Sequence, residues 1–485
     1  MNVYFSDVFQ VSSESLEQYG AFNLSVLTDL PLFIDPFLLF NSKKPEYQNL
    51  HNEIINYLSF LRDKSRTTQL DRGLLGAWYR FAEVKQNWFG FCISGNQGRG
   101  LGPKFAMALH SNLHNLFTDF GQEKVTSGSH LEKLCLVKDG VGRDNISDFV
   151  TNLIKEFLLE YTQNFAIQYI NEKYRSKVPV TKARFNYKTE TWETVVYELP
   201  KFRNDYVLLT PNDLLTKDDI WINKTDLERD FDNIPSSIPN QQLRAQINNY
   251  FLSVLPKDAD NKERTKAIRK VLEQFPEVID YYIKFKEERG DTATSISEQK
   301  VDDSRRLYVE QFRRLIELLE EKTGFYESEG RTSEDAYERI LYLKEVIEKQ
   351  DGYRIFYVKG QPIKKEEDLQ IAYKLTWFAA SSDVNREVNN GRGPVDFKIS
   401  RGSKDKTLVE FKLASNSQLA RNLQNQVEIY EAANNTNNSF KVIMYFTEAE
   451  HDKVQSILRT LKLDNSRNII LIDARSDNKP SASTA

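Results

Sequence analysis

GRGPVDFKIS (391–400) and TLVEFKLA (407–414) are the stretches that decide the fold of the C-terminal part of this chain. Both are rich in β-forming residues, and the polar, glycine-containing segment between them predicts a hairpin turn. Residues two apart on a strand face the same side of a sheet. Glu410 and Lys412 therefore project together, while Phe411 points into the packed layer. The hairpin is expected to bring Asp396 near Glu410.

This pattern indicates a site for chemistry on phosphates. Two converging carboxylates repel unless a cation lies between them, and charged residues on a buried strand need a partner. Mg²⁺ prefers oxygen ligands and commonly bridges carboxylates to phosphate oxygens. Lys412 would orient or help deprotonate a metal-bound water and stabilise charge on the phosphate. The structural alternative is a hairpin salt bridge of Lys412 with Asp396 or Glu410, worth at most about 1 kcal/mol when exposed.

Helix and strand patterns alternate around this hairpin. They predict a mixed sheet flanked by helices. Strands are expected at 353–358, 383–388, 394–400, 407–414, 440–446 and 467–474, and helices at 364–380, 417–434 and 451–462. The polar, small-residue tail 476–485 is expected to be disordered.

The segments 394–396 (Pro-Val-Asp) and 410–412 (Glu-Phe-Lys) resemble the Pro-Asp … Asp/Glu-x-Lys signature of the PD-(D/E)XK nuclease superfamily. Val395, between the proline and the aspartate, is a departure from that signature. The order of elements over 353–474 is similar to the αβββαβ core of the superfamily. The resemblance implies a restriction-endonuclease-like domain at 351–475 that hydrolyses phosphodiester bonds with Mg²⁺, for which Mn²⁺ can substitute.

The resemblance also implies a set of acidic metal ligands. Asp396 and Glu410 match the two acidic positions of the hairpin. The first acidic motif of the superfamily usually lies on the preceding helix, where Glu367 is the match. Its neighbour Glu366, and Glu387 on the first strand of the meander, are the alternatives for completing the site.

Further roles follow from the resemblance for residues around Lys412, which would lie beside the nucleophile. Gln426 and Tyr430 resemble a Gln-x-x-x-Tyr motif that some branches carry on the next helix. Gln426 would position water or Lys412, and Tyr430 would contact nucleic acid. Arg392 and Lys398 flank Asp396 and would hold phosphates, with a solvated hairpin edge as the alternative.

Residues 1–225 predict an α+β domain whose role is recognition or regulation. Within it, 146–170 predicts one amphipathic helix with Ser147 as its N-cap. Gly98, Gly100 and Gly102 form a glycine-rich loop before a helix, an arrangement that can cradle phosphate. No Walker A motif is present, so a plain loop is the alternative.

Residues 226–350 are dense in charge and poor in proline and glycine. They predict a charged helical region that serves as a linker or as a surface for homo-oligomerisation. Residues 291–304 are expected to interrupt it as a flexible break. The whole chain is therefore expected to be an α/β multidomain protein of three units.

Composition limits the functional class of the 485 residues. A net charge of −4 excludes a wholly basic nucleic-acid wrapper but leaves room for a local basic groove. Two cysteines cannot build a disulfide framework, which favours the reducing cytoplasm. No apolar run approaches the ~20 residues of a membrane span, so no membrane partner is expected.

These features together predict a metal-dependent endonuclease. DNA is the expected substrate, and a role in bacterial antiviral (anti-phage) defence or restriction is expected by analogy. An RNase or toxin on the same fold is one alternative, because no base-reading motif separates RNA from DNA. A non-catalytic nucleic-acid-binding or regulatory module is the other.

Overall fold

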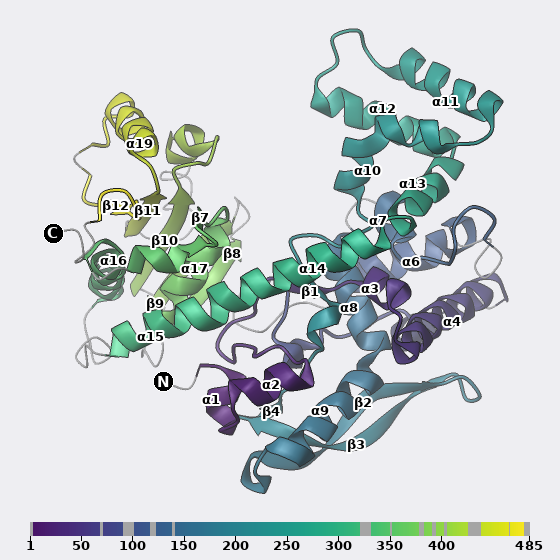
Figure 1. Cartoon of the computed structure of the whole chain (residues 1–485), viewed down its shortest axis with the longest axis horizontal. Coiled ribbons are helices and arrows are strands. Elements are labelled where there is room, and N and C mark those ends of the chain that lie inside the picture. The colour runs from purple at the N-terminus through teal and green to yellow at the C-terminus, as the bar shows by residue number, and fades with distance from the viewer. Residues whose placement is uncertain are drawn as a thin grey trace.

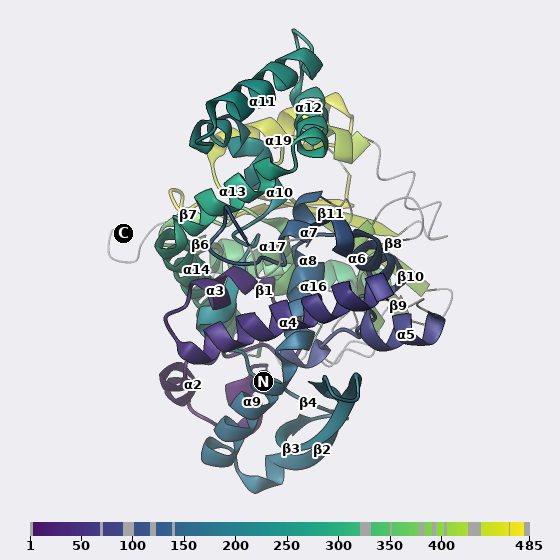
Figure 2. The same ribbon diagram turned by 90° about the vertical axis from the view of Figure 1, so that its right-hand side faces the viewer.

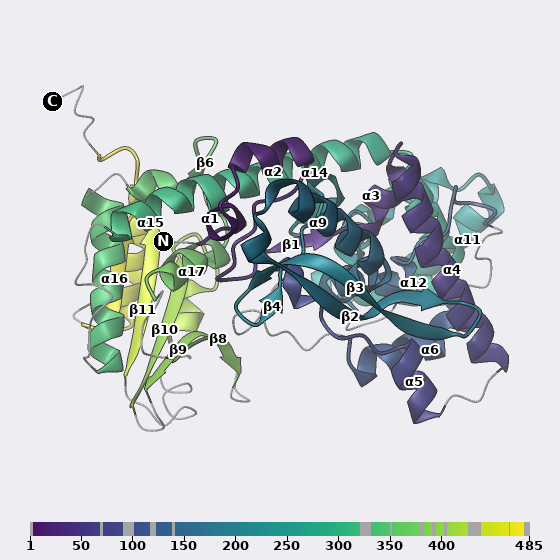
Figure 3. The ribbon, with the colours of Figure 1, turned by 90° about the horizontal axis from the view of Figure 1, so that it is seen from below.

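The computed structural model describes residues 3–67, 71–90, 101–116, 123–137, 141–320, 331–349, 352–377, 383–389, 394–401, 405–424, 438–464 and 466–479. The chain forms an N-terminal unit of mixed helix and strand, a lobe of helices, and a C-terminal mixed sheet (Figure 1). One long helical rod runs from the N-terminal unit to the C-terminal sheet (Figure 3).

The N-terminal unit is built around buried helices and a two-stranded sheet. Its helices are α1 Phe5–Phe9, α2 Ser13–Tyr19, α3 Pro36–Asn41, α4 Pro45–Thr67, α5 Arg72–Trp78, α6 Pro103–Leu116, α7 Lys133–Val137, α8 Arg143–Leu153 and α9 Lys155–Tyr169. Its paired strands are β1 Leu32–Ile34 and β5 Leu215–Lys217, which run antiparallel.

The single helix expected at 146–170 is wrong in detail. The structure has two helices, α8 and α9, which meet at Ile154. Ser147 does not cap α8, which begins after Gly142. Instead, the Ser147 hydroxyl accepts a hydrogen bond of 2.9 Å from the backbone N–H of Ile34 in β1. The serine thus satisfies a buried backbone donor of another element, a long-range partner that local pattern does not reveal.

A separate hairpin extends from this unit. It consists of β2 Arg175–Asn186, β3 Thr191–Phe202 and the short β4 Asp205–Tyr206. Figures 1 and 2 place this hairpin and the helical lobe at opposite ends of the N-terminal unit. The helices of the lobe are α10 Lys224–Asp230, α11 Gln241–Val254, α12 Asn261–Gln274 and α13 Glu277–Glu287.

The prediction of a flexible break at 291–304 is wrong. These residues form α14 Gly290–Ser304, which continues through a π-helical segment, Arg305–Gln311, into α15 Phe312–Glu320. Ala293, Ser297 and Val301 are buried at helical spacing against the N-terminal unit. The Ser297 hydroxyl lies 3.3 Å from that of Thr216. Tertiary packing on one face thus outweighs the weak helix propensity of the serines and threonines.

The C-terminal sheet has the strand order β12-β11-β10-β9-β8. Strands β8, β9 and β10 are antiparallel, and β10, β11 and β12 are parallel. Helices α16 and α17 pack against the sheet, α16 along strands β9 to β12 and α17 on β10. The bounds are α16 Thr332–Lys349, α17 Glu366–Leu375, β8 Asp383–Asn389, β9 Pro394–Arg401, β10 Asp405–Leu413, β11 Ser439–Tyr445, α19 Glu448–Thr460 and β12 Ile469–Asp473.

The prediction of a strand at 353–358 is wrong for most of these residues. Gly352–Phe356 form a 3₁₀ helix, and only β6 Tyr357–Val358 pairs, with β7 Gln361–Pro362. A Cβ atom on Gly352 would lie 2.5 Å from the Val346 carbonyl oxygen of α16. The chain therefore turns tightly back on α16 here, and this close approach requires glycine.

Part of the C-terminal tail, which begins at residue 476, contacts the sheet. Asn478 donates a 2.8 Å hydrogen bond to Asp473 at the end of β12, so the structure places the first residues of the segment expected to be disordered. Residues 480–485 lie outside the described residues. Among the described residues, no helix combines the length and apolar character that crossing a membrane requires.

Candidate active site on strand β10

Strand β10 lies at the centre of the C-terminal sheet and is buried on both faces. On one face, the Phe411 ring packs against Tyr373 of α17 and Phe397 of β9, with centroid distances of 4.8 and 5.9 Å. On the other face, Glu410 and Lys412 are only 6% and 7% exposed. The predicted division of the strand into an apolar and a charged face is confirmed. Buried charges of this kind require partners.

Lys412 is the centre of the charged cluster. Its Nζ lies 3.2 Å from Glu366 Oε2 and 3.2 Å from Glu410 Oε1. Burial lowers the pKa of Lys412, but the carboxylates of Asp396, Glu410 and Glu366 together outweigh it and hold that pKa above its usual range. Lys412 is therefore a fixed ammonium group at neutral pH.

Asp396 approaches the same cluster from β9. Its Oδ2 accepts a 2.5 Å hydrogen bond from the backbone N–H of Phe411, the residue between Glu410 and Lys412. The pKa of Asp396 is raised to about 6: burial is the largest cause, Lys412 lowers the pKa, and Glu410 and Glu366 raise it. The predicted convergence of Asp396 on the Glu-Phe-Lys segment is thus present in the fold.

The acidic residue that α17 contributes to this cluster is Glu366, one of the alternatives left open. It lies in the first turn of α17, where its Oε1 accepts hydrogen bonds from the Leu413 N–H at 3.4 Å and from Asn416 Nδ2 at 2.9 Å. Glu367 lines the same cavity. Glu387 belongs to β8, but its side chain lies outside the described residues.

Lys441 is a member of the cluster that sequence patterns did not single out. Parallel pairing places Lys441 of β11 beside Glu410, and its Nζ lies 3.7 Å from Glu410 Oε2. It is 6% exposed. A lysine in the otherwise apolar strand 440–446 was the available signal, but its position beside Glu410 depends on the register between β10 and β11.

A cavity of about 570 Å³ opens in front of the cluster. Acidic, amide and basic side chains from α17 and from the ends of β9 and β10 surround it. The lining includes Lys364, Lys365, Glu366, Glu367, Gln370, Asp396, Ser415 and Asn416. Glu366 and Asp396 therefore face a polar, accessible space that could receive a charged substrate, and Glu410 and Lys412 lie behind them, outside the lining.

Other predicted residues are only partly placed. Lys398 lies on β9 two residues after Asp396, hence on the same side of that strand, and is partly exposed. Gly102 precedes α6, and its carbonyl oxygen accepts a 3.1 Å hydrogen bond from the Ala106 N–H. The remaining candidates lie outside the described residues: Gly98, Gly100, Arg392, Gln426 and Tyr430.

A second acidic group lies apart on α19. Glu448, His451 and Asp452 bring ligand-type atoms within 4.8 Å of one another. Glu448 is already paired with Arg475, and His451 Nδ1 lies 3.6 Å from Glu448. These contacts account for the group as surface ion pairing.

Two family models match the chain. Residues 10–223 match a domain of unknown function (DUF8370), and residues 332–448 match a second domain of unknown function (DUF8371). Neither a curated protein nor a solved structure matches. The second match begins at α16 and includes α17 and strands β8 to β11. The whole carboxylate and lysine cluster therefore lies within the DUF8371 match.

Proposed function

We propose that the C-terminal part of the chain is a Mg²⁺-dependent nuclease that hydrolyses phosphodiester bonds, with DNA as its substrate. The observation that carries the proposal is the convergence of three carboxylates on one lysine. Glu366 comes from α17, Asp396 from β9 and Glu410 from β10, and Lys412 contacts two of them at 3.2 Å. The order of the described helices and strands is similar to the αβββαβ order expected of a restriction-endonuclease-like core, and this similarity supports the proposal.

The donor set fits a hard divalent cation. Carboxylate and amide oxygens are the ligands that Mg²⁺ prefers. Asp396, Glu410 and Glu366 would hold the ion, and the hydrogen bond from Asn416 Nδ2 orients Glu366. Glu410 raises the pKa of Asp396, and a divalent cation between the two carboxylates would relieve that repulsion. When bound, the metal would supply a Lewis acid that activates water and polarises the phosphate.

The chain's own residues would position the reactants. Lys412 is held as an ammonium group by the surrounding carboxylates, so it would orient the attacking water and stabilise negative charge on the phosphate. Lys441 would fix Glu410 through their 3.7 Å ion pair. Lys364 and Lys365 line the cavity and would contact the phosphate backbone without reading sequence.

Cleavage assays test the proposal directly. Purified protein is incubated with supercoiled plasmid and, separately, with single-stranded RNA, in Mg²⁺ and in EDTA. We expect plasmid cleavage in Mg²⁺ alone, and a loss of about 10²-fold or more in Glu410→Gln and in Lys412→Met. Asp452→Asn, an exposed carboxylate of the same domain, is the matched control and should cut like the wild type.

The alternatives have distinct outcomes. Cleavage of RNA and never of DNA would establish an RNase or toxin instead. If neither nucleic acid is cut with Mg²⁺ or Mn²⁺, yet a gel shift shows binding, the domain is a non-catalytic module. A role in cytoplasmic antiviral defence is part of the proposal and predicts that a plasmid-borne copy lowers phage plaque numbers, while the Glu410→Gln copy does not.

A further inference from the structure

The first turn of α17 carries two carboxylates that face in different directions. Glu366 lines the cavity beside β10 and lies 3.2 Å from Lys412. Asp368 is 3% exposed and does not line that cavity. Two residues along an α-helix are about 200° apart around its axis, so these side chains leave nearly opposite sides of α17. A contact that fixes Asp368 therefore also fixes the direction in which Glu366 points.

Asp368 is held by residues from the N-terminal half of the chain. The hydroxyl of Tyr308, in the π-helical segment, donates a 2.6 Å hydrogen bond to Asp368 Oδ1. The Nζ atom of Lys217, at the end of β5, lies 3.6 Å from the same oxygen and 4.9 Å from the centre of the Tyr308 ring. Burial raises the pKa of Tyr308 well above its usual value, so the phenol remains a hydrogen-bond donor. Buried carboxylates require such partners, so both contacts are costly to break.

A second ion pair joins the same two elements. Asp218, the residue after Lys217, pairs with Lys365, the N-cap residue of α17. The backbone of Asp218 has a φ of +77°, in the left-handed region that aspartate adopts more readily than most residues. Two successive residues of the N-terminal unit, at this turn after β5, therefore contact the start of α17.

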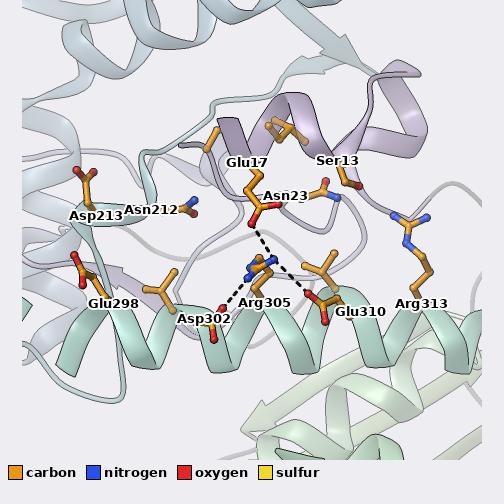
Figure 4. A pocket seen from close by; sticks show the side chains of 14 residues that line it. Ser13, Glu17, Asn23, Asn212, Asp213, Glu298, Asp302, Arg305, Glu310 and Arg313 are labelled. Carbon is orange, nitrogen blue, oxygen red and sulfur yellow. Dashed lines mark hydrogen bonds and ion pairs between the residues drawn. The ribbon is translucent and has the colours of Figure 1, made fainter. Parts of the chain in front are cut away.

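The π-helical segment that carries Tyr308 is itself attached to the N-terminal unit. In the cavity drawn in Figure 4, Arg305 of this segment pairs with Glu17 of α2 at 3.3 Å. The hydroxyl of Tyr4 donates a hydrogen bond to the carbonyl oxygen of Tyr308. Segments of π-helix are rare and are frequent at functional sites. The N-terminal unit thus sets the position of Tyr308 and, through it, that of Asp368.

Contacts inside the C-terminal unit act on Glu366 in another way. Asn416 Nδ2 donates a 2.9 Å hydrogen bond to Glu366 Oε1, and Lys412 Nζ lies 3.2 Å from Glu366 Oε2. Both contacts orient the carboxylate once α17 is in place. A rotation of α17 about its axis would move Glu366 away from both partners, and the contacts of Asp368 oppose such a rotation.

We infer that Lys217 and Tyr308 are positioning residues for Glu366. By holding Asp368 they fix the rotation of α17, so the N-terminal half of the chain completes the metal site of the C-terminal unit. The inference rests on the proposed nuclease function, in which Glu366 helps to hold Mg²⁺. It gives the N-terminal unit, through Lys217, a role in the metal site that needs no contact with the substrate.

Calorimetric titration of the full-length protein with Mg²⁺, in the absence of nucleic acid, tests this. Loss of a residue that directly supports a metal ligand weakens metal binding by about 10- to 100-fold, and Lys217 acts one step further away. We therefore expect Lys217→Met to weaken Mg²⁺ binding by roughly three- to tenfold. Tyr308→Phe, which removes only the hydroxyl, should weaken it in the same range. Lys217→Arg keeps the charge and should restore most of the affinity.

The Mg²⁺ dependence of plasmid cleavage is the second readout. The Mg²⁺ concentration for half-maximal cleavage should rise by the same factor in Lys217→Met, while the rate at saturating Mg²⁺ stays close to that of the wild type. Lys359→Met is the matched control, because it removes a 2.9 Å ion pair with Asp303 of α14 that also joins the rod to the C-terminal unit but lies outside α17. This variant should bind Mg²⁺ like the wild type.

Two results would overturn the inference and leave the nuclease proposal standing. The first is wild-type Mg²⁺ affinity in both Lys217→Met and Tyr308→Phe, when the wild type binds Mg²⁺ and cuts plasmid. The second is an equal weakening by Lys217→Met and Lys359→Met, which would indicate a general loosening between the two halves of the chain. A wild type that neither binds Mg²⁺ nor cuts DNA or RNA would overturn both proposals. The titrations are run where unfolding curves show every variant to be folded.

Discussion

Glu132 is a buried carboxyl group that should make the stability of the N-terminal unit depend on pH. It is 1% exposed, and its Oε1 has no hydrogen-bond partner among the described residues. The pKa of Glu132 is raised to about 8, chiefly by burial and also by the nearby carboxylates of Asp35 and Glu287. His130 faces it as well, with Nδ1 3.9 Å from Glu132 Oε2. The change to test is Glu132→Gln, which keeps the shape and removes the titration.

The direction of the pH dependence follows from proton binding to Glu132. In the unfolded chain Glu132 titrates near its ordinary pKa of 4.5, and in the folded protein near 8. Between these values the folded state holds a proton that the unfolded state has lost, so stability falls as pH rises. The slope is at most about 1.4 kcal/mol per pH unit. From pH 5 to pH 8, the wild type should lose roughly 3 kcal/mol relative to Glu132→Gln.

Urea unfolding at pH 5, 6, 7 and 8, followed by circular dichroism, measures this difference. Asp35, whose pKa burial raises to about 6, contributes a slope of its own, but it is present in both proteins. The difference between the two curves therefore reports the titration of Glu132 together with its coupling to Asp35. Glu160→Gln, an exposed glutamate on α9, is the matched control and should follow the wild type. Parallel curves for wild type and Glu132→Gln would refute the reasoning.

Three further predictions concern the C-terminal part. Mg²⁺ at about ten times its Kd should stabilise the wild type by ~1.4 kcal/mol in thermal unfolding and leave Glu410→Gln unchanged, and equal shifts would argue against the metal site. Tyr308→Phe removes the 2.6 Å hydrogen bond to buried Asp368 and should cost about 1–3 kcal/mol in urea unfolding; no loss would mean the contact is dispensable. Arg339→Met removes a buried guanidinium group that lies over the Trp377 ring, 4.3 Å from its centroid. It should lower the free energy of unfolding by about 3–5 kcal/mol, because the groups that Arg339 contacts lose their partner. A gain in stability would show that burying the guanidinium costs more free energy than its contacts return.

Local pattern was sufficient for much of the C-terminal sheet. Strands β8 to β12 lie where alternation and turn residues predict them, because period-two patterning and hairpin turns act over a few residues. The opposite faces of Phe411 and of Glu410 with Lys412 follow from the same geometry. The hairpin also predicted that Asp396 lies near Glu410, since antiparallel pairing needs only a short turn.

Contacts between side chains that are distant in the sequence could not be predicted from local pattern. Glu366 and Glu367 are adjacent on α17, and their different contacts depend on the rotation of that helix over β10. Lys441 meets Glu410 only through the parallel register of β10 and β11, which a crossover of some 25 residues separates. Helix α14 forms because one of its faces is buried against the N-terminal unit. The residues of this segment taken alone favour a break in the helix.

The sequence by itself determined the strand faces, the hairpin and the types of side chain at the candidate site, since these depend on neighbours along the chain. The tertiary structure alone decided which glutamate of α17 contacts Lys412, and the burial of Glu132 near Asp35 and Glu287. The physical reason is that burial and long-range charge act through space. Their magnitudes are set by which elements pack together, and that packing involves residues hundreds of positions apart.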